Sequence, residues 1–329
     1  MAYFFRFWSQ VIRTALYIIR HRRIETRRAY ALLDTVEKRH EGSFAAATRR
    51  KIAVSYGIYT PMICDAFTLL HGRRTSLAER ERFIHYFICS SLFDDFTDYA
   101  AFPLEEMHAI SFDPEHFAPR NFDESVFRDS HLLLRSHVRE RVVYDALTRR
   151  LFQAQWDSKK QASVGLSREA LQEITFRKGG LSVLLCSFYL DHSPTPAERD
   201  CWYRIGTIIQ LTNDLFDIYK DQQENMDTLP VRMTDAHAFR EFFEEQISGM
   251  QAAMGRLEAP GRRLEAFRLA MAGICAFGLI ALDQLEALQG DAASLPPLDA
   301  LARKQLVIDM EKRGNLVKWL KYTYHYTGL

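Results

Sequence analysis

The sequence has few of the residues that interrupt helices. Its 329 residues include 15 glycines and 10 prolines, together about 8% of the chain, where about 12% is usual in globular proteins. Glycine and proline supply many of the turns between strands and between short helices, so their shortage favours long helices. We also find no segment with a convincing strand pattern and no internal repeat of constant period. The sequence therefore predicts an all-α protein.

A strong net charge and metal-binding cysteine patterns are also missing. The formal net charge is +1, which argues against nucleic acid as the main partner, because nucleic-acid-binding proteins need a surplus of positive charge. The five cysteines have spacings that suit no metal site: Cys64, Cys89, Cys186, Cys201 and Cys275. Most lie in apolar helical context, which is typical of reduced core residues in a cytoplasmic protein. The longest uncharged run, Leu269–Leu282, is too short to span a bilayer and predicts a buried helix.

The first 28 residues form an apolar and basic segment. A helix over residues 3–20 would place these apolar side chains on one face: Phe4, Trp8, Val11, Ile12, Ala15, Leu16 and Ile19. The basic run RHRRIETRR follows at residues 20–28. Such a helix either lies on an anionic membrane surface, near lipid-soluble substrates, or packs on the body of the protein or on a partner subunit, which we favour. We expect no cleavable signal, because Arg6 and Arg13 interrupt the apolar stretch.

Apolar periodicity and capping residues predict the helices of the remaining chain. We expect them at residues 29–71 (two helices, separated at Gly42–Ser43), 77–98, 125–163, 168–190, 197–223, 234–256, 261–289 and 299–321. The signatures SLAE at Ser76 and SREA at Ser167 mark two of the helix starts. Residues 101–124 hold three prolines and are expected to form the longest loop. We treat residues 1–28 as an N-terminal helix and residues 29–329 as one helical domain.

A glycine pair, Gly179–Gly180, lies inside the helix expected after Ser167. Glycine costs a helix about 1 kcal/mol per residue relative to alanine, so the pair requires an explanation. Either the helix kinks and presents backbone groups, Arg177 and Lys178 to a bound substrate, or two helices approach closely and the two cations lie at the surface. The sequence does not separate these explanations.

The stretch 211–224, LTNDLFDIYKDQQE, holds the clearest chemical signal. Asn213, Asp217 and Asp221 recur every four residues, with Asp214 beside the first, so a helix would align them in one stripe. Two carboxylates ~4 Å apart repel each other by about 4 kcal/mol at an effective dielectric constant of ~20, so a cation must offset the repulsion. Since every donor is an oxygen, Mg²⁺ fits better than zinc or iron.

A second acidic cluster lies upstream, in SSLFDDFTDY. It consists of Asp94, Asp95 and Asp98, of which the first and last share a helix face. Each cluster alone is also compatible with a solvated charged face or an acidic helix end. Two oxygen-rich clusters on aromatic helices can instead hold several Mg²⁺ ions against an anion such as diphosphate.

The two clusters resemble the metal motifs of class I isoprenoid synthases. DDFTD at 94–98 is similar to their first motif, DDxxD, and NDLFDIYKD at 213–221 is similar to the NDxxSxxKE motif of bacterial terpene synthases. Asp217 replaces the usual Ser or Thr, and Asp221 the usual Glu; the unchanged motif positions are Asn213, Asp214, Leu215, Phe216 and Lys220. The same stretch also resembles the second DDxxD of prenyl diphosphate synthases and, with TLP at 228–230, squalene and phytoene synthases.

The departures place the chain nearest to the prenyltransferase-like (class IB) terpene synthases. No GGKxxRP-like segment precedes the first motif, as chain-elongating synthases would have, and DDxxD is not the DxxED form of squalene synthases. Ser167, followed by Arg168, occupies the place of the diphosphate-sensing arginine of terpene synthases. Arg177 or Lys178 is the better candidate for that role.

The resemblance implies a large antiparallel helical bundle around a central apolar cavity. It implies three Mg²⁺ ions that bind a prenyl diphosphate, and these metal ligands: Asp94, Asp95, Asp98, Asn213, Asp214, Asp217 and Asp221. It also implies catalytic cations or closing groups at Arg177, Lys178, Lys220, Arg313 and Tyr322. The small residues Cys89 and Ser90, one turn before DDxxD, favour a long substrate of C20 or more. A homodimer is common among similar folds.

The predicted function is that of a Mg²⁺-dependent terpene synthase, which releases diphosphate and gives a terpene hydrocarbon or alcohol. One alternative is a prenyltransferase that joins two prenyl diphosphates, and another is a non-catalytic helical partner subunit. A carboxylate-bridged di-iron bundle needs two ExxH pairs, and the only obvious one is Glu37–His40.

Overall fold

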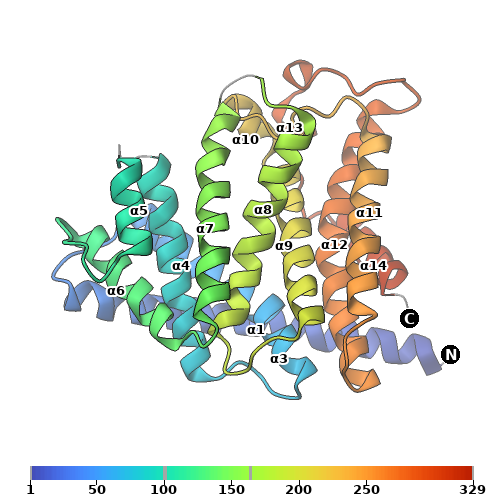
Figure 1. Ribbon diagram of the computed structural model, residues 1–329. Coiled ribbons are helices and arrows are strands. Elements are labelled where there is room, and N and C mark those ends of the chain that lie inside the picture. Colours follow the sequence, from blue (N-terminus) through green and yellow to red (C-terminus); the bar gives the residue numbers. More distant parts are fainter. Residues whose placement is uncertain (1, 99–101, 163–164, 328–329) are drawn as a thin grey trace. The chain divides into compact units, whose positions relative to one another are not determined.

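The computed structural model describes residues 2–98, 102–162 and 165–327, and the side chains of residues 2–6 and 98 lie outside that description. Every regular element in these ranges is helical, with no strand among them, as Figure 1 shows. The all-α prediction is confirmed. The chain divides into two compact units, Met1–Asp145 with Phe188–Ser193, and Ala146–Ser187 with Pro194–Leu329.

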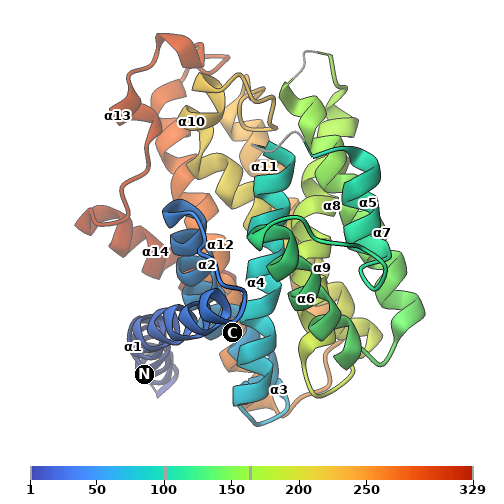
Figure 2. The ribbon, with the colours of Figure 1, turned by 90° about the vertical axis from the view of Figure 1, so that its left-hand side faces the viewer.

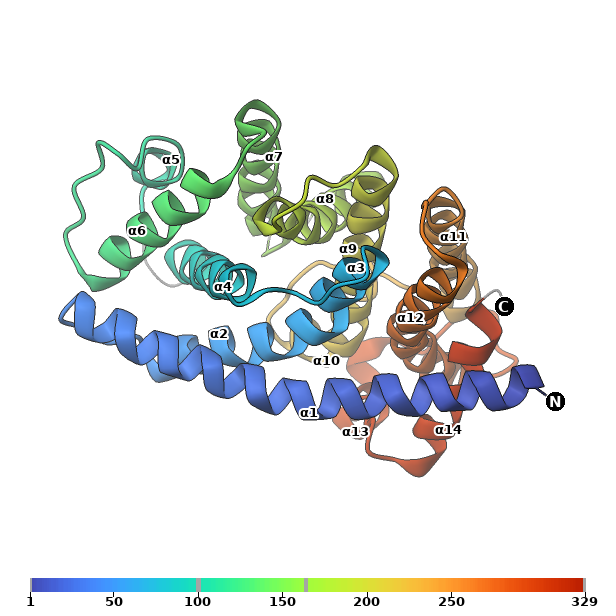
Figure 3. The same ribbon diagram turned by 90° about the horizontal axis from the view of Figure 1, so that it is seen from below.

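The first unit contains most of the N-terminal helices. These are α1 Ala2–Arg39, α2 Ala46–Tyr59, the π-helical turn Thr60–Cys64, α3 Asp65–Leu70, α4 Leu77–Asp98, α5 Leu104–Phe112 and α6 Phe122–His137. The helix α1 continues through the basic run and past residue 28 without a break and packs beside α2 (Figure 3). Beyond residue 28, the buried side chains of α1 are Ala29, Leu33 and Val36.

A proline explains the π-helical turn between α2 and α3. Pro61 lies inside the helical stretch Ala46–Leu70. Proline donates no backbone hydrogen bond and its ring clashes with the carbonyl of residue i−4, so the helix widens locally to Thr60–Cys64 instead of continuing in α form.

The cap predicted for α4 is confirmed, and the loop predicted after it is partly wrong. The Ser76 hydroxyl accepts a hydrogen bond from the Glu79 amide (3.2 Å), and the Glu79 carboxylate accepts one from the Ser76 amide (2.6 Å). Within residues 101–124, α5 follows Pro103 and buries Met107 and Ile110 completely. The prolines therefore bracket a short helix, which its sequence alone did not reveal.

The second unit holds the C-terminal helices. These are α8 Arg168–Cys186, α9 Pro196–Phe216, α10 Ile218–Gln223, α11 Ala236–Met254, α12 Gly261–Gln289, α13 Arg303–Leu306 and α14 Arg313–Tyr326. The helix α7, Arg141–Ser158, begins in the first unit and ends in this one, and short 3₁₀ turns lie at Lys159–Ala162, Ser187–Tyr189 and Leu298–Ala300. The single helix expected at 299–321 is wrong, because residues 307–312 separate α13 from α14.

The glycine pair does not break α8. Figures 1 and 2 show α8 beside α9. A Cβ atom on Gly179 would lie 2.5 Å from the carbonyl oxygen of Gly206, and one on Gly180 would lie 2.5 Å from the Tyr203 ring. Of the two explanations that the sequence left open, the close approach of two helices therefore accounts for the pair, and a kink does not.

Two stretches, Ala46–Leu70 and Gly261–Gln289, are long and apolar enough to cross a membrane by length and composition. In each, 67% of the apolar window is buried inside the structure. Core helices pass the same test, so these stretches are weak evidence for a membrane span. The buried helix predicted at Leu269–Leu282 is confirmed as part of α12.

Candidate functional site

The last turns of α4 present the first acidic cluster. Buried Leu92 and Phe96 anchor this part of the helix, and Asp94 and Asp95 are half-buried beside them. The backbone of Asp98 belongs to α4, but its side chain lies outside the described residues. The predicted ligands Asp94 and Asp95 are thus brought together at one end of α4.

Two side chains of α2 meet these carboxylates. Lys51 Nζ donates to Asp94 Oδ2 (2.7 Å), and Thr48 Oγ1 donates to Asp95 Oδ2 (2.5 Å). Thr48 and Lys51 are three residues apart, so they project from the same side of α2. Arg49, between them, pairs with Asp34 and Glu37 of α1 instead. Lys51 thus supplies positive charge to the first cluster, and sequence reasoning missed it.

A further carboxyl group lies close to the first cluster. Burial raises the pKa of Asp123, in the first turn of α6, and the negative charge of Asp95 raises it further. Sequence reasoning missed Asp123 because it belongs to no recognisable motif. The first cluster therefore carries more negative charge than the motif alone indicates.

The second acidic cluster lies where α9 gives way to α10. Asn213 and Asp214 are in the last turn of α9, and Asp217 is the single residue between the helices, with φ −92° and ψ 4°. The backbone bonds Asp217 N–H to Asn213 O and Asp221 N–H to Asp217 O, both 2.8 Å, continue the helical pattern across this junction. The predicted stripe is therefore retained, although the helix expected at 197–223 is interrupted at one residue.

Asp214 is the buried member of the second cluster, with 9% of its surface exposed. It accepts a hydrogen bond from Gln210 Nε2 (2.7 Å). Burial raises the pKa of Asp214 to about 7, against the opposing effects of Gln210 and of the positive charge of Lys178. Lys178 precedes Gly179 on α8, so the close contact of α8 with α9 brings its charge toward Asp214.

The pKa values of Asp217 and Asp221 are raised as well. Burial, followed by the charge of Asp217, raises the pKa of Asp221 to about 6, while Lys220 and a hydrogen bond with Thr228 oppose the rise. Asp217 is exposed by surface area, but the surrounding protein still partly desolvates its carboxyl group. This desolvation raises the pKa of Asp217, and the charge of Lys220 again opposes the rise. In the part of the chain that the structure describes, no Lys, Arg or His forms an ion pair within 4.0 Å with Asp214, Asp217 or Asp221.

The predicted cations near the second cluster differ in what they contact. Arg177 pairs with Glu173 on its own helix, and 41% of its side chain is exposed. Lys220 is more exposed, at 63%, and lies 3.8 Å from Glu224. Of the two cations at the glycine pair, Lys178 is the one whose charge lowers the pKa of Asp214.

Arg313 and Tyr322 lie on α14. The Tyr322 hydroxyl donates to Asp283 of α12, which also accepts from Arg240 (2.6 Å) and pairs with Lys318 (2.9 Å). Arg313 is exposed at the start of the helix. Figures 1 and 2 show α10 and α13 at one end of this unit, with α14 farther along α12. The structure thus does not bring these two residues to the second cluster.

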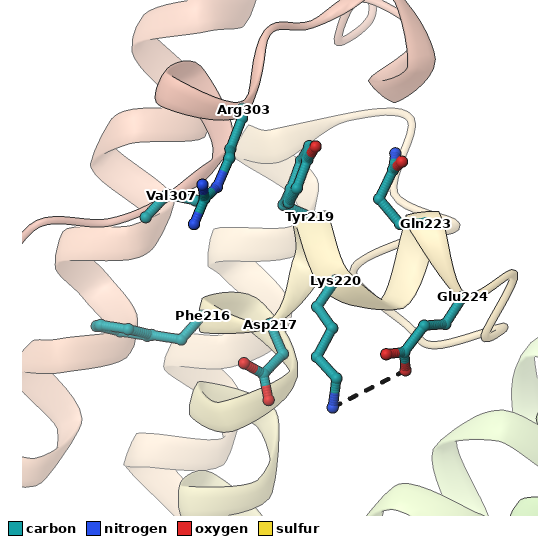
Figure 4. Close-up of a pocket in the computed structure, with 8 residues that line it drawn as sticks. All are labelled: Phe216, Asp217, Tyr219, Lys220, Gln223, Glu224, Arg303 and Val307. Carbon is teal, nitrogen blue, oxygen red and sulfur yellow. Dashed lines mark ion pairs between the residues drawn. The ribbon is translucent and has the colours of Figure 1, made fainter.

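A pocket of about 400 Å³ lies between α10 and the α13 region. Figure 4 shows the side chains that line it: Phe216, Asp217, Tyr219, Lys220, Gln223, Glu224, Arg303 and Val307. The Arg303 guanidinium lies 5.8 Å from the centre of the Tyr219 ring. Because Asp217 of the second cluster lines the pocket together with the neighbouring Lys220, the pocket adjoins the second cluster and offers space for a polar group beside it.

The small residues expected to set substrate length have different surroundings. Cys89 is buried, and its thiol lies 3.8 Å from the Phe127 carbonyl oxygen on α6. Ser90 is half-buried. Tyr86 and Phe87 lie one turn before them, with ring centres 5.5 Å apart. Two buried aromatic rings thus precede the first cluster on α4.

The donors of both clusters fit a hard divalent cation. The side chains are carboxylates and one amide, all oxygen donors, and the buried Asp214 and the half-buried Asp221 form no ion pair with a cation of the described residues. Such a set suits Mg²⁺ and suits soft metals poorly.

No protein-family model matches the chain, and no curated protein matches it in sequence.

Proposed function

We propose that the protein is a Mg²⁺-dependent terpene synthase of the class I isoprenoid synthase type. The observation that carries the proposal is the second cluster: an aligned stripe of oxygen donors whose acids have no ion-pair partner among the described residues. Keeping uncompensated carboxylates together costs stability. A bound cation would offset this cost. The first cluster, in turn, resembles the DDxxD motif, which is the other metal motif of class I isoprenoid synthases.

The residues of both clusters would hold Mg²⁺ against the diphosphate of the substrate. The proposed ligands are the predicted ones: Asp94, Asp95 and Asp98 from α4, and Asn213, Asp214, Asp217 and Asp221 from α9, α10 and the residue between them. Bound Mg²⁺ supplies stabilisation of the negative charge that develops on the leaving diphosphate. Asp123 adds a carboxylate beside Asp95 and is a further candidate for holding metal-bound water.

The chain's own cations assist the same bond cleavage. The allylic C–O bond breaks, its electron pair leaves with the diphosphate, and an allylic carbocation remains. Lys178 and Lys220 carry positive charge next to the second cluster and stabilise the departing anion. The carbocation then either loses a proton to the released diphosphate to give a hydrocarbon, or adds water and loses a proton to the same anion to give an alcohol. Aromatic side chains stabilise such a cation through their π faces.

The test is diphosphate release from C10 to C25 allylic diphosphates, each supplied alone and then with isopentenyl diphosphate. We expect Mg²⁺-dependent release from a single long substrate of C20 or more, with a hydrocarbon or alcohol extracted into organic solvent. Release only in the presence of a second diphosphate would assign the prenyltransferase alternative. Folded protein that is silent on every substrate would favour the non-catalytic partner subunit.

A further inference from the structure

One side of α1 leaves large aliphatic side chains uncovered. Ile12, Leu16 and Ile19 are 54%, 62% and 57% exposed. Their spacing of four and three residues places them on one side of the helix. Phe7 and Val11, in contrast, are only 3% exposed. Single exposed aliphatic residues are ordinary, whereas contiguous apolar surface is typical of interaction sites.

The same segment is strongly basic. Residues 2–24 contain no Asp or Glu, and the arginines that accompany the stripe are exposed: Arg13, Arg20, Arg22 and Arg23. The first acid of the chain, Glu25, is buried and pairs with Arg28 (3.1 Å) and Arg80 (2.9 Å). It therefore does not offset the surface charge. We call the exposed side formed by Ile12, Leu16, Ile19 and these four arginines the outer face of α1.

The charge of the outer face decides between two kinds of occupant. A second copy of the chain, paired symmetrically through this face, would place arginines against arginines. An anionic bilayer satisfies both features, because the aliphatic stripe enters the boundary between headgroups and acyl chains while the arginines meet lipid phosphates. The half-buried Trp8, one turn before Ile12, is of the type that settles at such a boundary.

We propose that the outer face of α1 binds an anionic lipid bilayer and that the helix lies in the plane of its surface. The helix is not among those apolar enough to cross a membrane, which agrees with a surface position. This inference does not depend on the proposed enzymatic function.

The test is co-sedimentation of the full-length protein with vesicles. One set contains phosphatidylcholine with about one third phosphatidylglycerol, and the other contains phosphatidylcholine alone. We expect binding to the anionic vesicles only, weakened by salt. Leu16→Glu should reduce the affinity at least about tenfold, and each of Arg20→Gln and Arg23→Gln should reduce it about fivefold.

A matched control uses an exposed aliphatic residue elsewhere. Val142 on α7 is 84% exposed, so Val142→Glu adds the same charge outside the outer face and should leave binding unchanged. Equal binding to both vesicle types, or full binding by Leu16→Glu, would overturn the proposal. So would a dimer in light scattering that Leu16→Glu dissociates, because the face would then join two copies of the chain.

Discussion

Neighbouring carboxylates repel each other in both acidic clusters, and the two clusters differ in what offsets that repulsion. In the first, α2 supplies the compensation: Lys51 forms an ion pair with Asp94, and Thr48 donates a hydrogen bond to Asp95. In the second, burial raises the pKa of Asp214 and Asp221 to about 7 and about 6, and no described cation pairs with them. The first cluster is thus already stabilised in the metal-free protein, whereas the second depends on protons or on a metal. We infer that the second cluster gains most from Mg²⁺.

Removing one carboxylate from the second cluster should have the largest effect. Asp221→Asn should lower the rate of diphosphate release at least about 100-fold, because it removes a ligand of the charge-stabilising ion. The same change should raise the stability of the metal-free protein by about 1 kcal/mol, since one source of repulsion disappears. Steady-state kinetics and urea unfolding in EDTA check the two outcomes.

A surface acid provides the matched control for that variant. Asp291 is exposed in the turn after α12, so Asp291→Asn should change neither activity nor stability. Loss of both activity and stability in Asp221→Asn would mean that Asp221 is a structural residue, contrary to our account.

Mg²⁺ itself should stabilise the folded protein through the second cluster. Binding to the folded state alone stabilises it by about 2.7 kcal/mol when the ion is at 100 times its dissociation constant. We expect thermal melting to shift upward with Mg²⁺ and inorganic diphosphate in the wild type and not in Asp217→Asn. An equal shift in both proteins would place the ion elsewhere.

The metal-free protein should lose stability as the pH rises from about 4 to about 7. A carboxyl group whose pKa is raised on folding binds its proton more tightly in the folded state than in the unfolded state. Its destabilising contribution is therefore absent below the unfolded pKa and complete above the folded pKa, which for Asp214 and Asp221 are about 7 and about 6. Unfolding in EDTA at several pH values should give a smaller loss for Asp221→Asn than for the wild type. Parallel curves would contradict the assignment.

The smallest effect should come from the compensated cluster. Lys51→Ala removes a partner that is 45% exposed, so it should destabilise the metal-free protein by no more than about 1 kcal/mol. It should also strengthen Mg²⁺ binding, because Asp94 no longer shares its charge with a lysine. Lys38→Ala, which removes an exposed lysine from α1, is the control. Calorimetry measures the stability and the Mg²⁺ binding of both variants. Weaker Mg²⁺ binding in Lys51→Ala would show that Lys51 helps to hold the anion instead.

Local signals in the sequence predicted the fold better than they predicted its contacts. Ser76 and Ser167 cap their helices as expected, because a cap needs only the next three residues. The short helix α5 and the division of the last helix depend on tertiary burial, and no local pattern revealed them. The glycine pair was ambiguous until Gly206, on another helix, was placed against it.

In the candidate site, too, local sequence signals were informative and tertiary contacts were not predictable. The spacing of Asn213, Asp217 and Asp221 predicted the stripe, since four residues make about one helical turn. The partner Lys51, however, is 43 residues away from Asp94 in sequence. Nothing in its basic stretch distinguishes it from the neighbouring Arg49, which turns toward α1. Only the packing of α2 against α4 selects it.

The most direct test of the account is calorimetric titration of the folded, metal-free protein with Mg²⁺ in the presence of inorganic diphosphate. Near pH 6.5, in two buffers with different ionisation heats, we predict binding that releases protons from the second cluster. Binding should be lost in Asp217→Asn and Asp221→Asn and retained in Asp291→Asn. Absence of Mg²⁺ binding in the wild type, or binding that survives both second-cluster variants, would contradict the claim that these acids are kept uncompensated for a metal ion.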